Sequence, residues 1–185
     1  MTLLCKSRID TYKADKCATS EEFCKLFTEG MTDLYLLSFV LTANHETAEQ
    51  CFAAGLADCI NGKPVFKQWA HSWAKRTIVH NAIQIMAPRP NRAGTFAGIH
   101  AETDGKRQRT HDQHAAIASV LALGDFDRFV FVMSLLERYT DEECSGLLHC
   151  SQQDIGKARM RALQQIGRKA EAGLLPQANR NSVAV

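Results

Sequence analysis

The chain has 185 residues, of which 45% are hydrophobic and 23% charged, and its formal net charge is +2. This composition is typical of a soluble globular protein with one large or two small domains, and it excludes nucleic-acid binding through overall charge alone. The longest apolar run, LYLLSFVL (34–41), is too short to span a bilayer, and the N-terminus lacks the apolar core of a signal peptide. We therefore expect a cytoplasmic protein without a membrane partner.

Helical periodicity dominates the first half of the chain, and no segment alternates cleanly with a period of two. A first helix is predicted from Ser20, which is expected to be its N-cap, with Phe23 and Phe27 on the inner face. Residues 31–44 are apolar all round, which predicts a buried central helix, and residues 45–60 follow with a single apolar stripe.

A further helix is predicted over residues 65–86, and its faces decide which side chains can reach a ligand. Trp69 and Trp73 are four residues apart on the expected inward side, where core packing is favoured over the alternative of stacking on an unpaired base. The inward side is also expected to hold Phe66, Ala70, Ala74 and Thr77, and the opposite side Val79 and Met86. Lys75 is expected opposite the tryptophans with Arg76 on its flank, so both are candidate nucleic-acid contacts.

The predicted fold class is all-α, with two small helical domains joined by a flexible linker. Residues 87–110 contain two prolines and three glycines without an apolar period, which indicates the linker. The expected organisation is an N-terminal extension (1–19), a helical domain (20–87), the linker (88–111), a second helical domain (112–173) and a tail (174–185).

Charge is distributed in the same way in both predicted domains. Residues 20–62 hold seven acidic residues and only Lys25 as a basic one, whereas residues 63–93 hold six basic residues and no acid. Residues 115–150 are again acidic, and residues 151–170 carry five basic residues against one acid. A charged run is often only a solvated helix face, but its repetition favours a basic contact surface at the end of each domain.

Residues 139–166 predict two short helices joined by a tight turn. Thr140 is expected to cap the first helix with Glu143 as its capping-box partner, and Ser151 the second with Asp154. The buried stripe of the second helix is expected to be Ile155, Ala158, Ala162 and Ile166. Such a pair forms a helix-turn-helix, whose second helix fits the major groove of DNA. The candidate DNA contacts are Ser151, Gln152, Gln153, Gly156, Lys157 and Arg161. The alternative is an ordinary helical hairpin with a solvated outer face.

The segment that contains the predicted helix-turn-helix resembles part of a known protein family. LGDFDRFVFVMSLLERYTDEECSGLLHCSQQDIGKARMRALQQI (123–166) resembles the C-terminal, promoter −35-binding domain of bacterial sigma factors of the extracytoplasmic-function group in the sigma-70 family. Arg128 heads the apolar helix, as in the family. LYLLSFVLTANHETAEQ (34–50) and FKQWAHSWAKRTIVH (66–80) are similar to segments of the family's N-terminal domain, which binds core RNA polymerase and the promoter −10 element.

The resemblance implies a DNA-binding protein that recognises promoters together with RNA polymerase, and no enzymatic activity. Lys75 and Arg76 would then lie near −10 DNA. After AEQ, where the family usually has a glutamine-glutamate pair that helps to bind the polymerase clamp, this chain has CFAAGLADC (51–59), which predicts a weak or absent polymerase contact. The alternatives are a diverged sigma-like regulator or a helical interaction module that does not bind core polymerase. An anti-sigma or other regulatory protein is a further candidate partner.

No cofactor or metal is predicted. The residues closest to a zinc ligand set are His111, His114, His149 and Cys150. Structural zinc sites need four ligands in closely spaced pairs, and the two linker histidines lack cysteine partners. Cys51 and Cys59 are two turns apart on one helix and are expected to pack in the core. Seven cysteines without a C-x-x-C pair favour reduced thiols, and no nucleotide-binding loop or nucleophile elbow indicates an enzyme.

Overall fold

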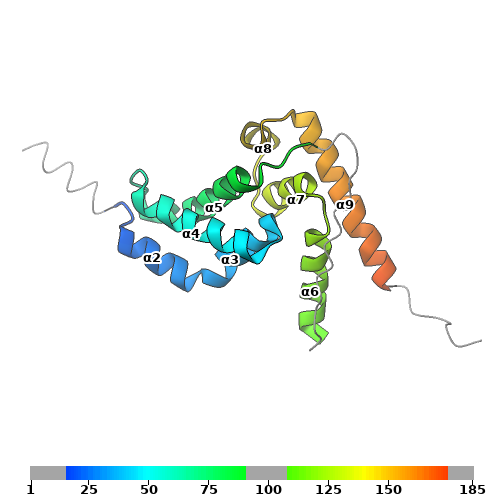
Figure 1. The fold of residues 1–185 in the computed structure, drawn as a ribbon, viewed down its shortest axis with the longest axis horizontal. Coiled ribbons are helices and arrows are strands. Elements are labelled where there is room, and N and C mark those ends of the chain that lie inside the picture. Colours follow the sequence, from blue (N-terminus) through cyan, green and yellow to red (C-terminus); the bar gives the residue numbers. More distant parts are fainter. Residues whose placement is uncertain (1–15, 91–107, 175–185) are drawn as a thin grey trace, which may run out of the picture. The chain divides into compact units, whose positions relative to one another are not determined.

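The computed structural model describes residues 16–90 and 108–174, and the chain divides into two compact units, Met1–Ala87 and Pro88–Val185. Both described stretches consist of helices joined by short turns (Figure 1), and their only β pairing is one isolated bridge, so the all-α prediction is confirmed. None of the described helices is both long and apolar enough to cross a membrane. The predictions for residues 1–15, for most of the linker (91–107) and for the tail (175–185) fall outside the described residues.

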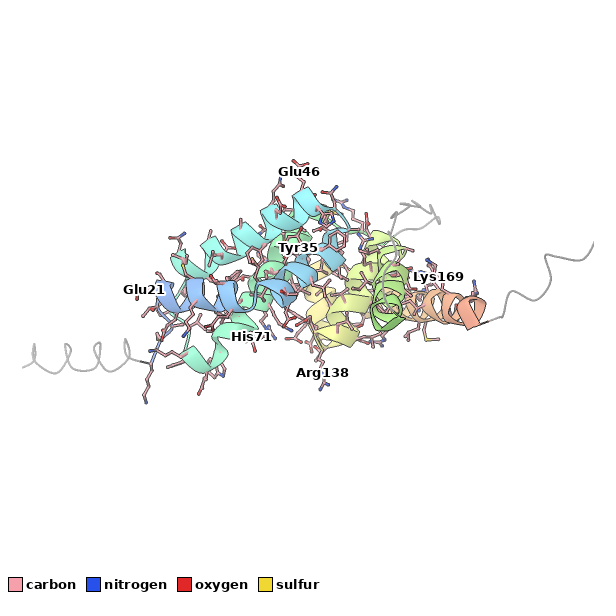
Figure 2. The ribbon with its side chains drawn as sticks, turned by 90° about the horizontal axis from the view of Figure 1, so that it is seen from below. Glu21, Tyr35, Glu46, His71, Arg138 and Lys169 are labelled. Atoms are coloured by element: carbon pink, nitrogen blue, oxygen red, sulfur yellow. The ribbon has the colours of Figure 1, made fainter. Side chains whose placement is uncertain are left out.

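Unit 1 is a bundle built around one buried helix. It contains α2 (Ser20–Glu29), α3 (Met31–Thr42), α4 (His45–Asn61), the short 3-10 helix η1 (Lys67–Trp69) and α5 (Ala70–Met86). Helices α3, α4 and α5 pack on one another, and α2 covers α3 and α4. As predicted, α3 packs in the centre of the unit, and its Leu34 and Leu41 are fully buried, but it is not buried all round, since Met31 and Leu36 are exposed. Acidic side chains such as Glu21 and Glu46 point away from the unit (Figure 2).

Helices α4 and α5 approach each other closely at Gly55. A Cβ atom at this position would lie 2.9 Å from Cγ1 of Ile78, which is itself completely buried. Cys51 packs one turn earlier, and its Sγ donates a hydrogen bond to the carbonyl oxygen of Ile78 at 3.2 Å. Cys59 is also buried, beside Thr77. Both cysteines therefore occupy the core, as expected.

Unit 1 begins earlier than the predicted boundary at residue 20. The backbone N–H of Ala18 donates to the carbonyl oxygen of Val65 at 2.7 Å, and Cys17 forms the β-bridge with Phe66. The N-cap of α2 is Thr19, not Ser20, because Thr19 has a glutamate three residues on and forms a reciprocal capping box. The capping-box rule could have identified Thr19, rather than Ser20, as the N-cap from the sequence alone.

The sequence prediction that the aromatic residues near the start of α5 face inward is wrong. The α-helix begins at Ala70 rather than near Val65, and Trp69, Trp73 and Phe66 are 57%, 38% and 42% exposed. Val79, expected on the opposite side, is completely buried. The contact with α4 is made instead by Thr77 and Ile78, which meet Gly55 and are buried. The expectation held for Ala70, Ala74 and Thr77, which are buried.

Unit 2 contains the predicted helix-turn-helix. Its elements are α6 (Gln108–Leu121), α7 (Asp125–Phe131), the π-helical turn η2 (Val132–Leu136), α8 (Asp141–Leu148) and α9 (Gln152–Leu174). Helix α6 begins four residues before the predicted domain start at 112, so the end of the predicted linker is helical. Helix α9 packs against α7 and α8, and Phe129, Met133 and Ile155 are fully buried between these elements.

The helix of α7 widens at its C-terminal end. The backbone N–H of Glu137 donates to the carbonyl oxygen of Val132 at 2.9 Å, five residues back, which closes a π-type turn. Arg138 follows with a φ of 59°, in the left-handed region. The chain then reverses into α8 through Tyr139, which is buried, and Thr140.

Candidate nucleic-acid interface

The turn between α8 and α9 is fixed by caps at both helices. Thr140 and Glu143 form a reciprocal capping box at the start of α8, as predicted. At the start of α9, Oγ of Ser151 accepts from the backbone N–H of Asp154 at 3.1 Å and donates to its carboxylate at 2.7 Å. His149 ends α8 in a left-handed conformation with a φ of 50°, and its N–H donates to the carbonyl oxygen of Ser145.

The inner faces of α8 and α9 form the core of this unit. Ile155, Ala158 and Ala162 on α9 are completely buried, as predicted, and Cys144 and Leu148 of α8 are buried as well. The fourth residue of the expected stripe, Ile166, is only half-buried. The burial pattern fixes which side of α9 faces away from the unit.

The predicted DNA contacts lie on this outer side of α9. Ser151, Gln152, Gln153, Lys157 and Arg161 are exposed, and Gly156 is half-buried. Gln153, Lys157 and Arg161 follow one another at intervals of four residues, which places them within about 80° around the helix axis. One helix face therefore combines a neutral amide with two cations.

Arg161 is paired with a carboxylate of another helix, which was not predicted from the sequence. Its Nε donates to Oδ2 of Asp127 on α7 at 2.9 Å, and its Nη2 donates to Oδ1 at 2.5 Å. The side chains of Arg161 and Asp127 are 48% and 18% exposed. The hydrogen bonds that Asp127 accepts raise the pKa of Arg161, against a smaller opposing effect of burial. The two residues are 34 positions apart, so no local spacing rule could have found the pair.

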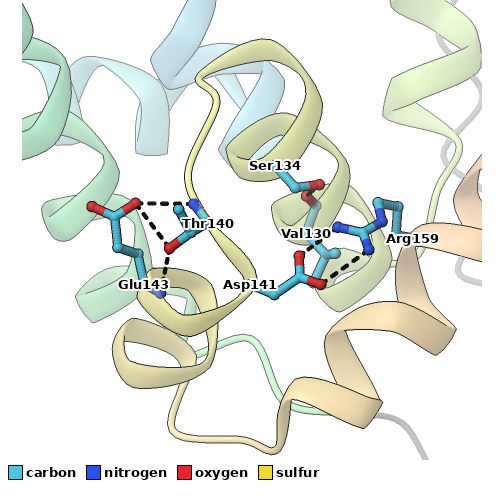
Figure 3. A network of polar contacts seen from close by, with 6 residues as sticks. All are labelled: Val130, Ser134, Thr140, Asp141, Glu143 and Arg159. Carbon is cyan, nitrogen blue, oxygen red and sulfur yellow. Dashed lines mark hydrogen bonds and ion pairs between the residues drawn. The ribbon is translucent and has the colours of Figure 1, made fainter.

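A second arginine of α9 links this helix to α8. Both terminal nitrogens of Arg159 donate to the carboxylate of Asp141, the bond from Nη2 being 3.0 Å long (Figure 3). Figure 3 also shows the Thr140–Glu143 cap beside this pair. Asp141 raises the pKa of Arg159 through these hydrogen bonds. The pair fixes α9 against α8 and thereby orients the outer face of the helix-turn-helix.

Arg128, which heads the apolar helix in the family resemblance, is a structural residue of this unit. It is almost fully buried, and its guanidinium donates to the carbonyl oxygen of Leu123 at 3.0 Å and to Asp125 at 2.7 Å. Burial lowers its pKa, and Asp125 opposes this effect. A buried arginine satisfied in this way does not present its charge to DNA.

The candidates in unit 1 lie on α5. Arg76 is exposed and Lys75 half-buried. The exposed aromatic residues Phe66, Trp69 and Trp73 precede them, and the rings of Phe66 and Trp69 meet edge-on at a centroid distance of 5.3 Å. Because aromatic surface of this size is normally buried, its exposure is consistent with a contact surface.

The buried thiols are not suited to nucleophilic attack at neutral pH. Burial raises the pKa of Cys51 and of Cys144 to about 11, and it also raises the pKa of Cys150. These thiols therefore stay protonated at neutral pH, whereas a thiolate is the form that acts as a nucleophile. In the parts of the chain that are described, no group of three or more His, Cys, Asp or Glu side chains is arranged to hold a metal ion.

Comparison with known proteins does not assign the chain to a family. No model of a known protein family matches the chain, and a search of curated proteins finds no related sequence. The relationship to sigma factors therefore remains a prediction.

Proposed function

We propose that this chain is a sigma-factor-like DNA-binding protein that recognises promoters and acts with RNA polymerase in transcription initiation. The main support is the geometry of α8, the turn and α9. Two capping boxes and the Arg159–Asp141 pair hold α9 with Gln153, Lys157 and Arg161 outward. A capped helix with this outer face has the shape and the donors needed for the major groove.

The roles of the α9 residues follow from their chemistry. Gln152 and Gln153 lie in the first turn, where helix-turn-helix proteins contact base edges, and an amide can pair with adenine in two hydrogen bonds. Ser151 caps the helix, and Gly156 lets the backbone approach a groove wall because it has no side chain. Lys157 is an exposed ammonium that suits a phosphate.

A DNA-binding experiment with matched variants tests this proposal. Duplexes selected from a randomised pool by the full chain are titrated by fluorescence anisotropy across a salt series. Lys157→Ala is expected to reduce the slope of log affinity against log salt by about one, whereas Gln153→Ala is expected to change sequence preference with little change in slope. Lys169→Ala is the charge control, because it lies about 18 Å further along the helix. If nothing is enriched and no affinity appears at low salt, the proposal is wrong.

In unit 1, we expect the −10 side of the promoter to meet α5. Trp69 and Trp73 are the two tryptophans of the chain, so intrinsic tryptophan fluorescence reports on this surface alone. A single-stranded oligonucleotide is expected to quench this fluorescence, and Lys75→Ala with Arg76→Ala is expected to weaken the quenching. Unchanged fluorescence at saturating oligonucleotide would exclude base stacking at the tryptophans.

A second candidate function is a regulator that binds DNA but not core polymerase. Its support is α4, where Cys51 is fully buried and Phe52 packs against Phe27 at a centroid distance of 5.1 Å. The next residue, Ala53, is exposed but has no polar group. A quantitative pull-down with purified core polymerase distinguishes the two functions, since stoichiometric binding would reject the second candidate.

A further inference from the structure

The Arg161–Asp127 pair leaves part of the arginine available. A guanidinium has two edges that each present a pair of N–H donors: one formed by Nε and Nη2, the other by Nη1 and Nη2. Asp127 occupies the first edge, through Nε at 2.9 Å and Nη2 at 2.5 Å. The terminal edge, with Nη1, takes no part in this pair. Since the Arg161 side chain is 48% exposed, this edge can meet a ligand without breaking the pair.

The terminal edge is the one that suits a base. Two parallel N–H groups match the O6 and N7 acceptors of guanine in the major groove, and this bidentate contact requires the guanidinium to be held in a fixed plane. A carboxylate bound to the other edge supplies that restraint. It also brings a negative charge next to the arginine, so the pair attracts phosphate less than a lone cation does.

We propose that Asp127 is a specificity-determining residue of the DNA interface, which holds Arg161 by one edge so that the other edge reads a guanine. This inference rests on the proposed DNA-binding function. Asp127 acts through Arg161 as a positioning residue, because its side chain lies on α7 and is mostly buried. Lys157, one turn away, would supply the phosphate contact that Arg161 largely gives up.

The test measures two properties, the salt dependence of binding and the discrimination between bases. The proposal predicts that Asp127→Asn increases the first and decreases the second. With duplexes selected by the full-length wild-type chain, Asp127→Asn is expected to steepen the log-log salt slope by about one, because Arg161 loses the carboxylate charge that is paired with it. Discrimination between guanine and the other bases at one position is expected to fall about tenfold. Glu142→Gln is the matched control, since it removes the same charge from an exposed side chain of α8 and is expected to change neither property.

A double variant separates positioning from a purely structural effect. In an Arg161→Ala background, Asp127→Asn is expected to leave discrimination unchanged, because the residue through which it acts is missing. Asp127→Ala provides a second variant, and helical circular dichroism checks that each variant folds. If wild type binds selected duplexes and Asp127→Asn behaves like Glu142→Gln, the inference is overturned while DNA binding stands. If wild type binds no duplex at low salt, the proposed function fails and the inference fails with it.

Discussion

At the scale of single residues, the two arginines of α9 show how one helix is fixed to both of its neighbours. Arg159 pairs with Asp141 of α8 and Arg161 with Asp127 of α7, although the arginines are only two positions apart. They also use different edges of the guanidinium. The Arg159–Asp141 pair ties both terminal nitrogens of Arg159 to α8, whereas Nη1 of Arg161 takes no part in the Arg161–Asp127 pair.

The Arg159–Asp141 pair should make a small and salt-sensitive contribution to stability. Its side chains are 32% and 39% exposed, so solvent screens the attraction. A double-mutant cycle with Arg159→Ala and Asp141→Ala is expected to give a coupling free energy of about 0.5–1 kcal/mol, measured by urea unfolding. Repeating the cycle in 1 M NaCl should reduce the coupling. A coupling that salt does not change would mean that packing, rather than charge, joins the two residues.

The buried thiols predict a loss of stability at alkaline pH. Burial raises the pKa of Cys51 in the folded chain from 9.0 to about 11. Between these values the unfolded chain has lost the thiol proton and the folded chain has kept it, so the stability present below pH 9 declines as pH rises toward 11. The expected loss is about 1–3 kcal/mol per thiol, measured as the difference between urea unfolding at pH 8 and at pH 10.5.

Two variants isolate this effect. Cys51→Ala is expected to reduce the difference between the two pH values, even if the variant is less stable at both. Cys24→Ala removes an exposed thiol and should leave the difference as in wild type. Equal pH dependence of wild type and Cys51→Ala would contradict the prediction.

At the scale of helices, the contact between α4 and α5 depends on the absence of a side chain at Gly55. Gly55→Ala would place a Cβ 2.9 Å from Ile78, so the gain in helix propensity is outweighed by overpacking, and we expect a net loss of about 1–2 kcal/mol. Gly146→Ala in α8 is the matched control, because nothing lies within 4 Å of its added Cβ. It should stabilise the chain by about 0.5–1 kcal/mol. Thermal unfolding would reveal these opposite signs.

The helix-turn-helix could be predicted in detail because its signals are local. The Thr140–Glu143 and Ser151–Asp154 caps are each three residues apart, and the structure confirms both. The apolar stripe of α9 follows a regular period over several turns. Short-range sequence rules are therefore sufficient to predict these two helices and the outer face of α9.

The faces of α5 could not be predicted in the same way, because they depend on the partner helix. The sequence shows large and small apolar residues along the predicted 65–86 helix, and hydrophobicity alone favours burying the tryptophans. Gly55 on α4 lets that helix approach α5 at Ile78, so Ile78 and Thr77 occupy the contact and the tryptophans lie on another side of α5. The pair of Asp127 with Arg161 was missed for a related reason, because it joins residues from separate helices.

At the scale of the whole molecule, each unit has its own buried core. Leu41 and Ile78 are completely buried in unit 1, and Phe129 and Ile155 in unit 2. We therefore expect fragments 16–90 and 108–174 to fold separately, each with a helical circular dichroism spectrum and a cooperative thermal transition. Noncooperative melting of either fragment would show that its core needs the rest of the chain.

The π-helical turn at Val132–Leu136 has a consequence for how the chain tolerates changes in its length. A turn closed five residues back contains one residue more than an ordinary helical turn. Removing Ser134 can convert it to the ordinary form and leave the buried residues of α7 in place. Removing Val130 from α7 instead rotates the following residues by about 100° and moves Val132 from a buried position to the half-buried position of Phe131. The turn therefore absorbs a one-residue insertion locally. We therefore expect a chain that lacks Ser134 to keep the same fold.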